Sequence, residues 1–418
     1  MDAPCYKDLK SVCRKQSEIT KALVEDFLLY YADRNDNLEK ETVRRLAPYR
    51  HVIRKLPDGW IPFFTSQYIA HRIFRKNGLI HKYFKHSAIK ALNPLDLQYL
   101  RDQINNPWRY CFSEITGQPA QDFYTMRDVF TGDSFLLYSP GVGTFLTEYP
   151  VMLWFNLLSF NGSCWQTFGP ISGFQSFGPD DIFFFASEMH PHIESDEDLL
   201  ADVERNPVPY SLLFSGSRHP LIFSRGEYVV QSMAEYDLDS FNTGGLNKNF
   251  KVEYARGVYR VTLKRWGGHP HYCTAYYDEN KAMLTLFSMT DRGFSQLVSR
   301  LNACGYHFSD QPDIRVSPSM LVVAGQILKK KVRLLRYDDL FEKESTEQEK
   351  EHLNRMNQFM KMAIKDLNAG RVPDIETLAK KAGVDVETAR GILEHAEKRF
   401  EKLKKSAQRL PKRKPTYK

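Results

Sequence analysis

The spacing of apolar residues changes near residue 107, and this change restricts the possible folds more than any other feature. Before it, segments around 17–32 and 38–54 carry apolar residues three or four positions apart, which indicates amphipathic helices. From 107 to 186, short aromatic and β-branched runs alternate with turn sequences such as Asn161-Gly162, which indicates strands. Helices followed by strands predict an α+β protein.

The chain has 418 residues, enough for two or three domains with a sizeable core. We expect a basic helical domain over 1–106, a β-rich central body over 107–343, a helical segment over 344–405 and a disordered basic tail over 406–418. The central body is expected to be a meander or small barrel with inserted helices, divisible into subdomains at 107–205 and 206–343. Residues 144–150 are interpreted as strand, because they follow the strand-like pattern of their neighbours.

The net charge of +7 conceals an uneven distribution. Residues 44–90 contain eleven Lys and Arg against the single acid Asp58, a net charge of +10. Residues 398–418 contain ten Lys and Arg against Glu401, a net charge of +9, so the rest of the chain carries −12. An acidic body with two strongly basic ends favours a polyanionic partner.

The stretch HRIFRKNGLIHKYFKHSAIK at 71–90 contains three histidines, six lysines and arginines, and no acid. We interpret it as two amphipathic helices, each basic on its outer side. The inner face of the second helix is expected to consist of Ile80, Phe84, Ala88 and Leu92. Basic residues beside aromatic ones provide both phosphate neutralisation and groups on which bases can stack. The predicted contacts are Arg72, Arg75, Lys76, Lys82, Lys85, Lys404, Lys412, Arg413 and Lys414, with Tyr83 as a stacking group.

Other interpretations of the basic stretch remain open. It is consistent with a solvated helix face, although such faces usually mix both signs of charge. An anionic membrane surface or an acidic protein would also be attracted to it. No apolar run reaches the roughly 18 residues that a membrane span needs, and no secretory leader is visible. We therefore expect a cytoplasmic protein without a membrane span.

The segment DIETLAKKAGVDVETARGILEHA at 374–396 resembles a helix-turn-helix. Ala379 stands where the two helices must approach closely, and Gly383 stands where the turn needs a positive φ. Ala389 replaces the larger aliphatic residue usual in that family. The resemblance implies DNA recognition by the helix that begins near Val386. Residues 371–397 nevertheless carry a net charge of −2, which favours a helical hairpin that packs on the body or on a protein partner.

Two His-Pro-His tripeptides raise the possibility of a metal-dependent enzyme. On an extended backbone, His190 and His192, or His269 and His271, would point to the same side. Such pairs without a carboxylate at a known spacing are more often simple polar positions at strand ends. The six cysteines have no CxxC spacing, so neither a zinc module nor a disulfide framework is predicted.

No catalytic motif or resident cofactor is predicted. The chain contains neither a P-loop nor a GxGxxG loop, and no GxSxG elbow or HExxH motif. The leading hypothesis is therefore a non-enzymatic, ribosome-associated or RNA-binding protein that contacts structured RNA or a ribonucleoprotein. The alternatives are a helix-turn-helix DNA-binding regulator and a metal-dependent enzyme that uses the His-Pro-His motifs.

Overall fold

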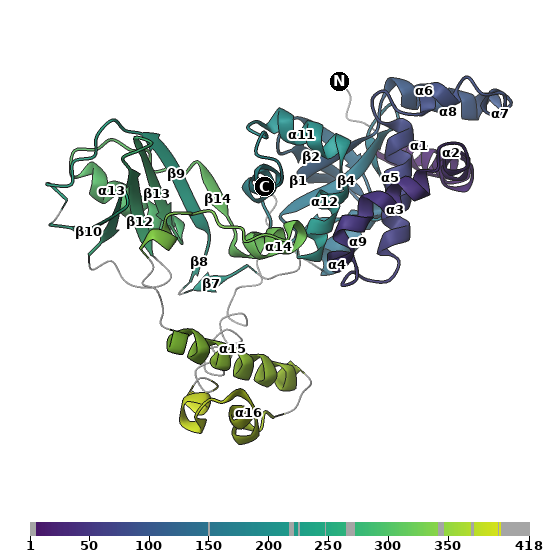
Figure 1. Ribbon diagram of the computed structural model, residues 1–418. Helices are drawn as coiled ribbons and strands as arrows, with labels where there is room; N and C mark the ends of the chain where they lie inside the picture. Colours follow the sequence, from purple (N-terminus) through teal and green to yellow (C-terminus); the bar gives the residue numbers. More distant parts are fainter. Residues whose placement is uncertain are drawn as a thin grey trace. The chain divides into compact units, whose positions relative to one another are not determined.

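The computed structural model describes residues 6–148, 151–216, 221–224, 226–246, 248–264, 272–341, 347–368, 372–391 and 393. The chain is an α+β protein with a helical N-terminal part and a β-rich centre, as the sequence predicts (Figure 1). It divides into two compact units, Met1–Arg336 and Tyr337–Lys418. The N-terminal helices and both large sheets belong to the first unit.

The N-terminal part consists of a series of mostly short helices. They are α1 (Tyr6–Ile19), the π-helix η1 (Thr20–Leu28), α2 (Leu29–Asp36), α3 (Leu38–Leu46), η2 (Ala47–Tyr49), α4 (Arg50–Ile53), α5 (Trp60–Phe74), α6 (Ile80–Tyr83), α7 (Ser87–Lys90) and α8 (Pro94–Asn105). The helix α5 is central to this part, since Tyr68, Ile69, Ile73 and Phe74 on it are all buried. Contacts of α2 and α3 with α5 hold the chain before residue 50 against the basic stretch.

The single helix expected over residues 80–92 is wrong. The chain forms α6 and α7 with a break between them, because His86 adopts an extended conformation with φ −78° and ψ 142°. The buried residues of this region are Ile80, Tyr83 and Ile89, a different set from the expected inner face. His86 instead contacts the Tyr31 hydroxyl through Nδ1 at 2.7 Å, so a tertiary hydrogen bond is formed at the break.

The first sheet closes into a small barrel. Its strands are β1 (Arg109–Ala120), β2 (Phe123–Asp128), β3 (Ser134–Tyr138), β4 (Leu153–Phe160), β5 (Trp165–Phe168) and β6 (Gly173–Phe174), in the order β1-β2-β3-β5-β4-β6. The additional pairing of β1 with β4 completes the ring. The first part of β1, Arg109–Ser113, pairs with β4, and the later part pairs with β2. Two register shifts after Ile115 interrupt the pairing with β2. The small barrel of the sequence prediction is therefore confirmed.

The strand order resembles that of the OB-fold, a five-stranded Greek-key barrel. The pairing of β3 with β5 is parallel, whereas the other barrel pairings are antiparallel. The helix α9 (Pro140–Glu148) joins β3 to β4 and packs on the barrel core through Val142 and Phe145. The expected strand over 144–150 is thus wrong for residues 144–148, because packing of Phe145 against Trp154 outweighs the β-propensity of the segment. Residues 149 and 150 lie outside the described residues.

A second, open sheet follows. Its strands are β9 (Gln231–Asp237), β10 (Phe250–Ala255), β11 (Val258–Leu263), β12 (Cys273–Asp278), β13 (Met283–Ser288) and β14 (Ile314–Val316), in the order β10-β11-β12-β13-β9-β14. All of these pairings are antiparallel. The helix α13 (Asp291–Asn302) covers one face, with Phe294, Leu297, Val298 and Leu301 in a shared core. The strands β7 (Phe223–Ser224) and β8 (Glu227–Tyr228) form a separate short hairpin.

The connecting segment between the two sheets is helical. It contains α10 (Pro179–Met189), α11 (Asp196–Arg205), α12 (Val208–Leu212) and η3 (Leu213–Ser215), and α14 (Pro318–Leu328) returns to it from the second sheet. The buried carboxylate of Asp181 on α10 accepts hydrogen bonds from the Ser317 backbone N–H at 2.8 Å and the Ser317 hydroxyl at 2.9 Å. Because Ser317 is the residue that precedes α14, this contact fixes the start of α14 against α10.

The second unit begins with η4 (Asp338–Leu340) and contains the long helix α15 (Glu347–Asn368) and α16 (Ile375–Ala382). Residues 386–391 form a further helical segment after the turn at Gly383. Phe359 and Ala363 of α15 are buried against Leu378, Ala379 and the residues that follow the turn. This small core shows that the hairpin packs against α15.

Candidate nucleic-acid interface

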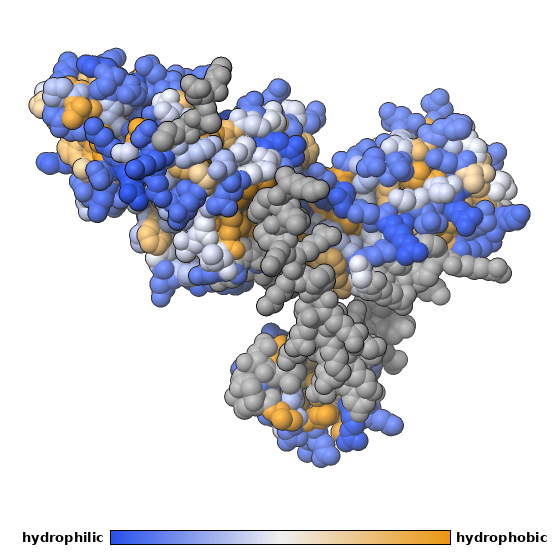
Figure 2. Space-filling view, turned by 180° about the vertical axis from the view of Figure 1, so that it is seen from behind, coloured by the Kyte–Doolittle hydropathy of each residue, from blue (hydrophilic) through white to orange (hydrophobic). Residues whose placement is uncertain are grey.

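Most basic side chains between residues 44 and 90 are exposed. Within the described part of the chain, nine of these eleven have no carboxylate within 4.0 Å: Arg44, Arg45, Arg50, Arg54, Lys55, Arg75, Lys76, Lys85 and Lys90. The other two, Arg72 and Lys82, form ion pairs with Glu41 and Asp36. Arg75 is the one unpaired cation of the nine that is partly buried. On the face drawn in Figure 2, hydrophilic residues cover much of the surface and hydrophobic residues form smaller patches among them. The basic stretch therefore keeps a cationic surface after folding, but fewer exposed, unpaired cations form it than the eleven Lys and Arg of the sequence.

Asp36, at the end of α2, neutralises part of the stretch. One of its carboxylate oxygens accepts a hydrogen bond from Lys82 Nζ at 2.6 Å, and the other accepts one from the Tyr83 hydroxyl at 2.6 Å. Partial burial opposes ionisation of Asp36, but these hydrogen bonds outweigh it and hold its pKa below the usual value. The Tyr83 side chain is fully buried, so the prediction that it stacks on a base is wrong.

Glu41, on α3, resembles Asp36 in that its carboxylate contacts both a tyrosine hydroxyl and a cation. Its carboxylate accepts a hydrogen bond from the buried Tyr68 hydroxyl at 2.7 Å and lies 3.4 Å from Arg72 Nε in an ion pair. Burial, followed by the bond to Glu41, raises the pKa of Tyr68 to about 12. In both places one carboxylate binds a buried tyrosine and a cation, so Arg72 and Lys82 hold the helices together.

Glu204, at the end of α11, links α5 to the barrel. Its side chain lies 2.6 Å from Nε2 of the fully buried His71 and accepts a hydrogen bond from the Tyr110 backbone N–H at 3.1 Å. Arg75 donates a hydrogen bond to the Glu204 backbone carbonyl at 3.1 Å. Burial, together with the nearby Arg72, lowers the pKa of Arg75. Arg75 is thus held by α11 in the lining of a cleft.

This cleft has a volume of about 520 Å³ and contains four cationic side chains, Arg75, Lys76, Arg109 and Arg205. They come from the end of α5, the start of β1 and the end of α11, and the acids in the lining are Asp128 and Glu204. Arg109 lies 3.6 Å from the buried Asp128 and 5.1 Å above the Trp165 ring. Lys76 and Arg205 are exposed and form no ion pair with a described residue.

Of the predicted contacts, Arg75 and Lys76 lie together in the cleft. Arg109 and Arg205 were not predicted, because they are separated from the basic stretch by tens of residues and neither belongs to a charge cluster. Lys85 is exposed on the turn between α6 and α7. The predicted contacts Lys404, Lys412, Arg413 and Lys414, and the expected disordered tail, lie outside the described residues.

The turns through which OB-folds bind oligonucleotides are covered here. The β1–β2 turn contains Asp122, which forms a 2.7 Å ion pair with Lys10 of α1. The β4–β5 turn contains Asn161, whose side-chain amide donates a hydrogen bond to Cys13 of α1 at 3.3 Å. Helix α1 therefore lies on both turns, and the cationic cleft lies at the other ends of β1 and β2.

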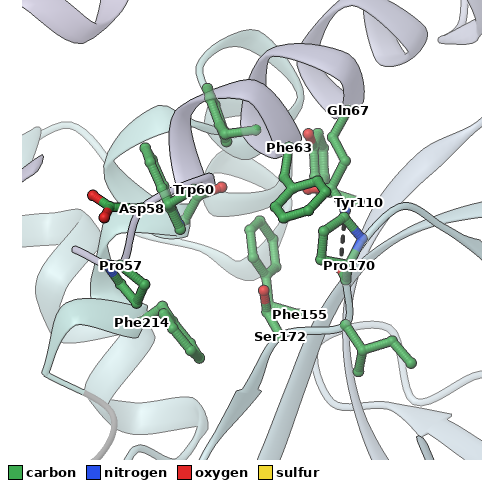
Figure 3. Close-up of a pocket in the computed structure, with 13 residues that line it drawn as sticks. Pro57, Asp58, Trp60, Phe63, Gln67, Tyr110, Phe155, Pro170, Ser172 and Phe214 are labelled. Atoms are coloured by element: carbon green, nitrogen blue, oxygen red, sulfur yellow. Dashed lines mark hydrogen bonds between the residues drawn. The ribbon is translucent and has the colours of Figure 1, made fainter. Parts of the chain in front are cut away.

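An aromatic pocket of about 210 Å³ lies beside α5 (Figure 3). Its lining includes Trp60, Phe63 and Phe64 from α5 and Phe155 from β4. In Figure 3, Phe63 and Phe155 lie on one side of the space, with Pro57, Trp60 and Phe214 on the other. Tyr110 lines both this pocket and the cationic cleft. Its hydroxyl is buried and has no hydrogen-bond partner among the described residues.

Residues 374–391 form a helix, a turn and a second helical segment, the local order that the resemblance implies. Gly383 ends α16 with φ +67°, and Ala379 is fully buried where the helices meet. Asp385 accepts a hydrogen bond from the Thr388 backbone N–H at 2.8 Å and therefore caps the second helix. Hydrogen bonding by the Thr388 side chain, and then by its backbone N–H, holds the pKa of Asp385 below its usual value, so a carboxylate stands at the end that would approach DNA.

The first His-Pro-His pair has its rings 5.5 Å apart, and His190 Nε2 lies 3.8 Å from Asp202. Among the residues that the structure describes, no group of three or more His, Cys, Asp or Glu side chains is arranged to hold a metal ion. The second pair, His269 and His271, lies outside the described residues.

No known protein family, curated protein or solved structure matches this chain. The likeness to the OB-fold therefore rests on strand order alone. Within the described ranges, no helix combines the length and apolar character that a bilayer crossing requires.

Proposed function

We propose that this protein is a non-enzymatic nucleic-acid-binding protein of the cytoplasm that contacts the phosphate backbone of structured RNA or of a ribonucleoprotein such as the ribosome. The observation that carries the proposal is the cleft in which Arg75, Lys76, Arg109 and Arg205 converge from three elements. Several cations that line one cavity can contact several phosphates of one nucleic-acid chain, which a single small anion does not offer. The eight exposed cations of residues 44–90 that lack an ion pair with a described residue would extend this attraction over the helical part.

The roles of the predicted residues are refined accordingly. Lys76, Arg205 and Lys85 are proposed as direct phosphate contacts, because their side chains are exposed. Arg75 and Arg109 are proposed to contribute positive charge from partly buried positions. Arg72 and Lys82 are proposed to act mainly within the fold, through Glu41 and Asp36.

The adjoining aromatic pocket supports RNA over duplex DNA. Sequence-tolerant recognition of unpaired RNA combines a cationic groove with aromatic side chains on which bases stack. Tyr110 belongs to both cavities, so an unpaired base in the aromatic pocket and phosphates in the cleft would lie on either side of one residue. The OB-like barrel supports the same class of ligand only by analogy.

The test is binding of the purified, nuclease-treated protein to bulk RNA, duplex DNA and ribosomes across a salt series. The cleft variant is Lys76→Ala/Arg205→Ala, and its matched control is Lys248→Ala/Lys361→Ala, which removes two exposed lysines elsewhere. Each lost phosphate contact should lower the slope of log K against log salt by about 0.7–0.9. We expect the cleft variant to lose roughly 1.5 of slope and the control to keep the wild-type slope.

The outcomes separate the alternatives. Equal losses in the cleft variant and the control would reject the cleft as the site. Specific binding to duplex DNA that is weakened by Arg390→Ala would favour the helix-turn-helix regulator. Absence of binding at low salt would reject nucleic acid altogether and leave the solvated face as the explanation of the charge.

A further inference from the structure

Cys13 and Cys164 meet although 151 residues separate them in the chain. Cys13 lies on α1, and Cys164 directly precedes β5 in the β4–β5 turn. Their sulfur atoms are 3.4 Å apart, and both side chains are buried. A disulfide bond requires about 2.05 Å between the sulfurs, so closing the pair needs a movement of little more than 1 Å.

The surroundings of the pair are polar on one side. The Asn161 side-chain amide donates hydrogen bonds to Cys13 Sγ at 3.3 Å and to Cys164 Sγ at 3.6 Å. Gln166 accepts from the same amide and donates to the Cys13 backbone carbonyl at 3.0 Å, which holds α1 at this position. The hydrogen bond from Cys164, with that from Asn161, lowers the pKa of Cys13, while the pKa of Cys164 is raised. Cys13 is therefore the better nucleophile of the two.

The other described cysteines have different environments. Cys111 donates a hydrogen bond to Asp128 at 3.2 Å, and burial raises its pKa well above the usual value. Burial also raises the pKa of Cys273, to about 12. Cys304 is partly exposed. Among the described residues, only Cys13 and Cys164 place two sulfurs within contact distance.

We propose that Cys13 and Cys164 form a reversible intramolecular disulfide that ties α1 to the β4–β5 turn of the barrel. A peroxide supplies the oxidising equivalents. The Cys13 thiolate attacks one oxygen of hydrogen peroxide and the O–O bond breaks, so Cys13 becomes a sulfenic acid and hydroxide leaves. The hydroxide takes up the proton that the Cys13 thiol released, which gives the first water. The Cys164 sulfur then attacks the sulfenic sulfur, and its S–H proton leaves with the hydroxyl group as a second water. Two thiols are oxidised and one peroxide is reduced.

The choice of oxidant follows from burial. Hydrogen peroxide is small and uncharged, so it can reach sulfurs that local opening of α1 exposes only briefly. Glutathione disulfide is larger and charged, and it must align its own sulfurs with the attacking thiolate. Peroxide is therefore expected to oxidise the pair faster than glutathione disulfide does. Reduction by a dithiol restores both thiols.

The structural consequence concerns α1. Its contacts with the barrel include the Lys10–Asp122 ion pair, the packing of Tyr6 and Leu9 against Phe123 and Tyr138, the hydrogen bonds of Asn161 and Gln166 to Cys13, and the cysteine pair itself. A covalent bond at this point would prevent α1 from leaving the two turns that it covers. Oxidation should thus stabilise the first unit, independently of whether the protein binds nucleic acid.

The experiment uses the full chain, fully reduced and then treated with hydrogen peroxide. Free thiols are alkylated, and peptides are mapped under non-reducing conditions. We expect the number of titratable thiols per denatured chain to fall from six to four, with one linked peptide that contains Cys13 and Cys164 and disappears on reduction. The melting temperature should rise by several degrees, and reduction should reverse this rise.

Cys304→Ser serves as a control that removes the partly exposed thiol and should leave the linked peptide and the thermal shift unchanged. Cys164→Ser should abolish both, and because the mapping is made on the wild-type chain, a poorly folded variant does not affect the conclusion. Linkage of Cys13 to another cysteine, or oxidation to sulfinic acid without linkage, would overturn the proposal. So would six titratable thiols after peroxide treatment.

Discussion

Replacement of Asp36 should separate two contributions of the basic stretch, its contacts within the fold and its positive charge toward a ligand. In the native protein its carboxylate binds both the buried Tyr83 hydroxyl and the half-exposed Lys82. Asp36→Ala leaves the hydroxyl without its partner. A hydrogen bond to a charged acceptor contributes about 1.5–3 kcal/mol, and the solvent-screened ion pair adds at most about 1 kcal/mol. We expect Asp36→Ala to lower the free energy of unfolding by about 2–4 kcal/mol.

Asp36→Asn provides the matched comparison, because its amide oxygen can still accept the Tyr83 hydrogen bond. Loss of the charge alone should cost about 1–2 kcal/mol, less than the alanine variant. Urea unfolding followed by tryptophan fluorescence measures both values, and all five tryptophans lie within residues 1–336. Equal destabilisation by both substitutions would refute the assignment of the hydrogen bond to Tyr83 as the main contribution.

The pH dependence has a defined sign. Partial burial opposes ionisation of Asp36, but the bonds from Lys82 and Tyr83 hold its pKa below the unfolded value. Such a carboxylate contributes stability above its unfolded pKa, and the contribution is lost as the pH falls through its folded pKa. The stability difference between the wild type and Asp36→Asn should therefore be constant near neutral pH and shrink below about pH 4. A difference that grows on acidification would refute the argument.

The same substitution tests the proposed function in the opposite direction. Both Asp36 variants release the Lys82 ammonium and remove one negative charge from the region. If the surface contacts phosphate, affinity for RNA should rise although stability falls, and the salt slope should increase by about 0.7–0.9 if Lys82 gains one contact. A mutation that only damages the fold would weaken binding instead.

Three further predictions concern other contacts. Burial raises the pKa of Asp181 to about 6, so between about pH 4 and 6 the folded state keeps a proton that the unfolded state releases. The free energy of unfolding of the wild type should therefore fall by about 2–3 kcal/mol as pH rises through that range. Urea unfolding at a series of pH values should show that Asp181→Asn removes most of this dependence. Gly383→Ala, at φ +67°, should cost the second unit about 1 kcal/mol, measured by circular dichroism of the full chain. Glu41→Gln should cost about 1–2 kcal/mol, less than Glu41→Ala, because its amide can still accept from Tyr68.

Local patterns in the sequence identified several elements correctly. Asn161-Gly162 predicted the turn between β4 and β5, and Ser317-Pro318 is a comparable local signal at the start of α14. In each case a side chain or a backbone conformation within a few residues decides the structure, so the information is present in a short window. The buried Ala379 and the positive φ at Gly383 belong to the same class.

Contacts between distant segments could not be read in the same way. Asp36 and Glu41 lie only a few residues before the acid-poor window, yet pairing with Lys82 and Arg72 depends on how α2 and α3 pack on the later helices. Glu204 reaches His71 from 133 residues away. The cysteine pair is similar, because no spacing rule connects a helix near the N-terminus to a hairpin turn in a barrel. The sequence therefore gives the number of charged residues and cysteines, whereas the tertiary structure determines which of them contact each other.

The number of cations that remain unpaired in the fold sets an upper limit on the salt slope of RNA binding. After intramolecular pairing, eight exposed cations of residues 44–90 lack a described ion partner, and Arg205 adds one cation of the cleft from outside this range. At about 0.7–0.9 per phosphate contact, these nine contacts give a salt slope of roughly 6–8, and a rigid surface that engages only some of them gives less. A steeper slope would require cations elsewhere, and the ten of residues 398–418 are the largest remaining group. Truncation after residue 397 should then remove the excess and leave the contribution of the cleft, which Lys76→Ala/Arg205→Ala removes separately.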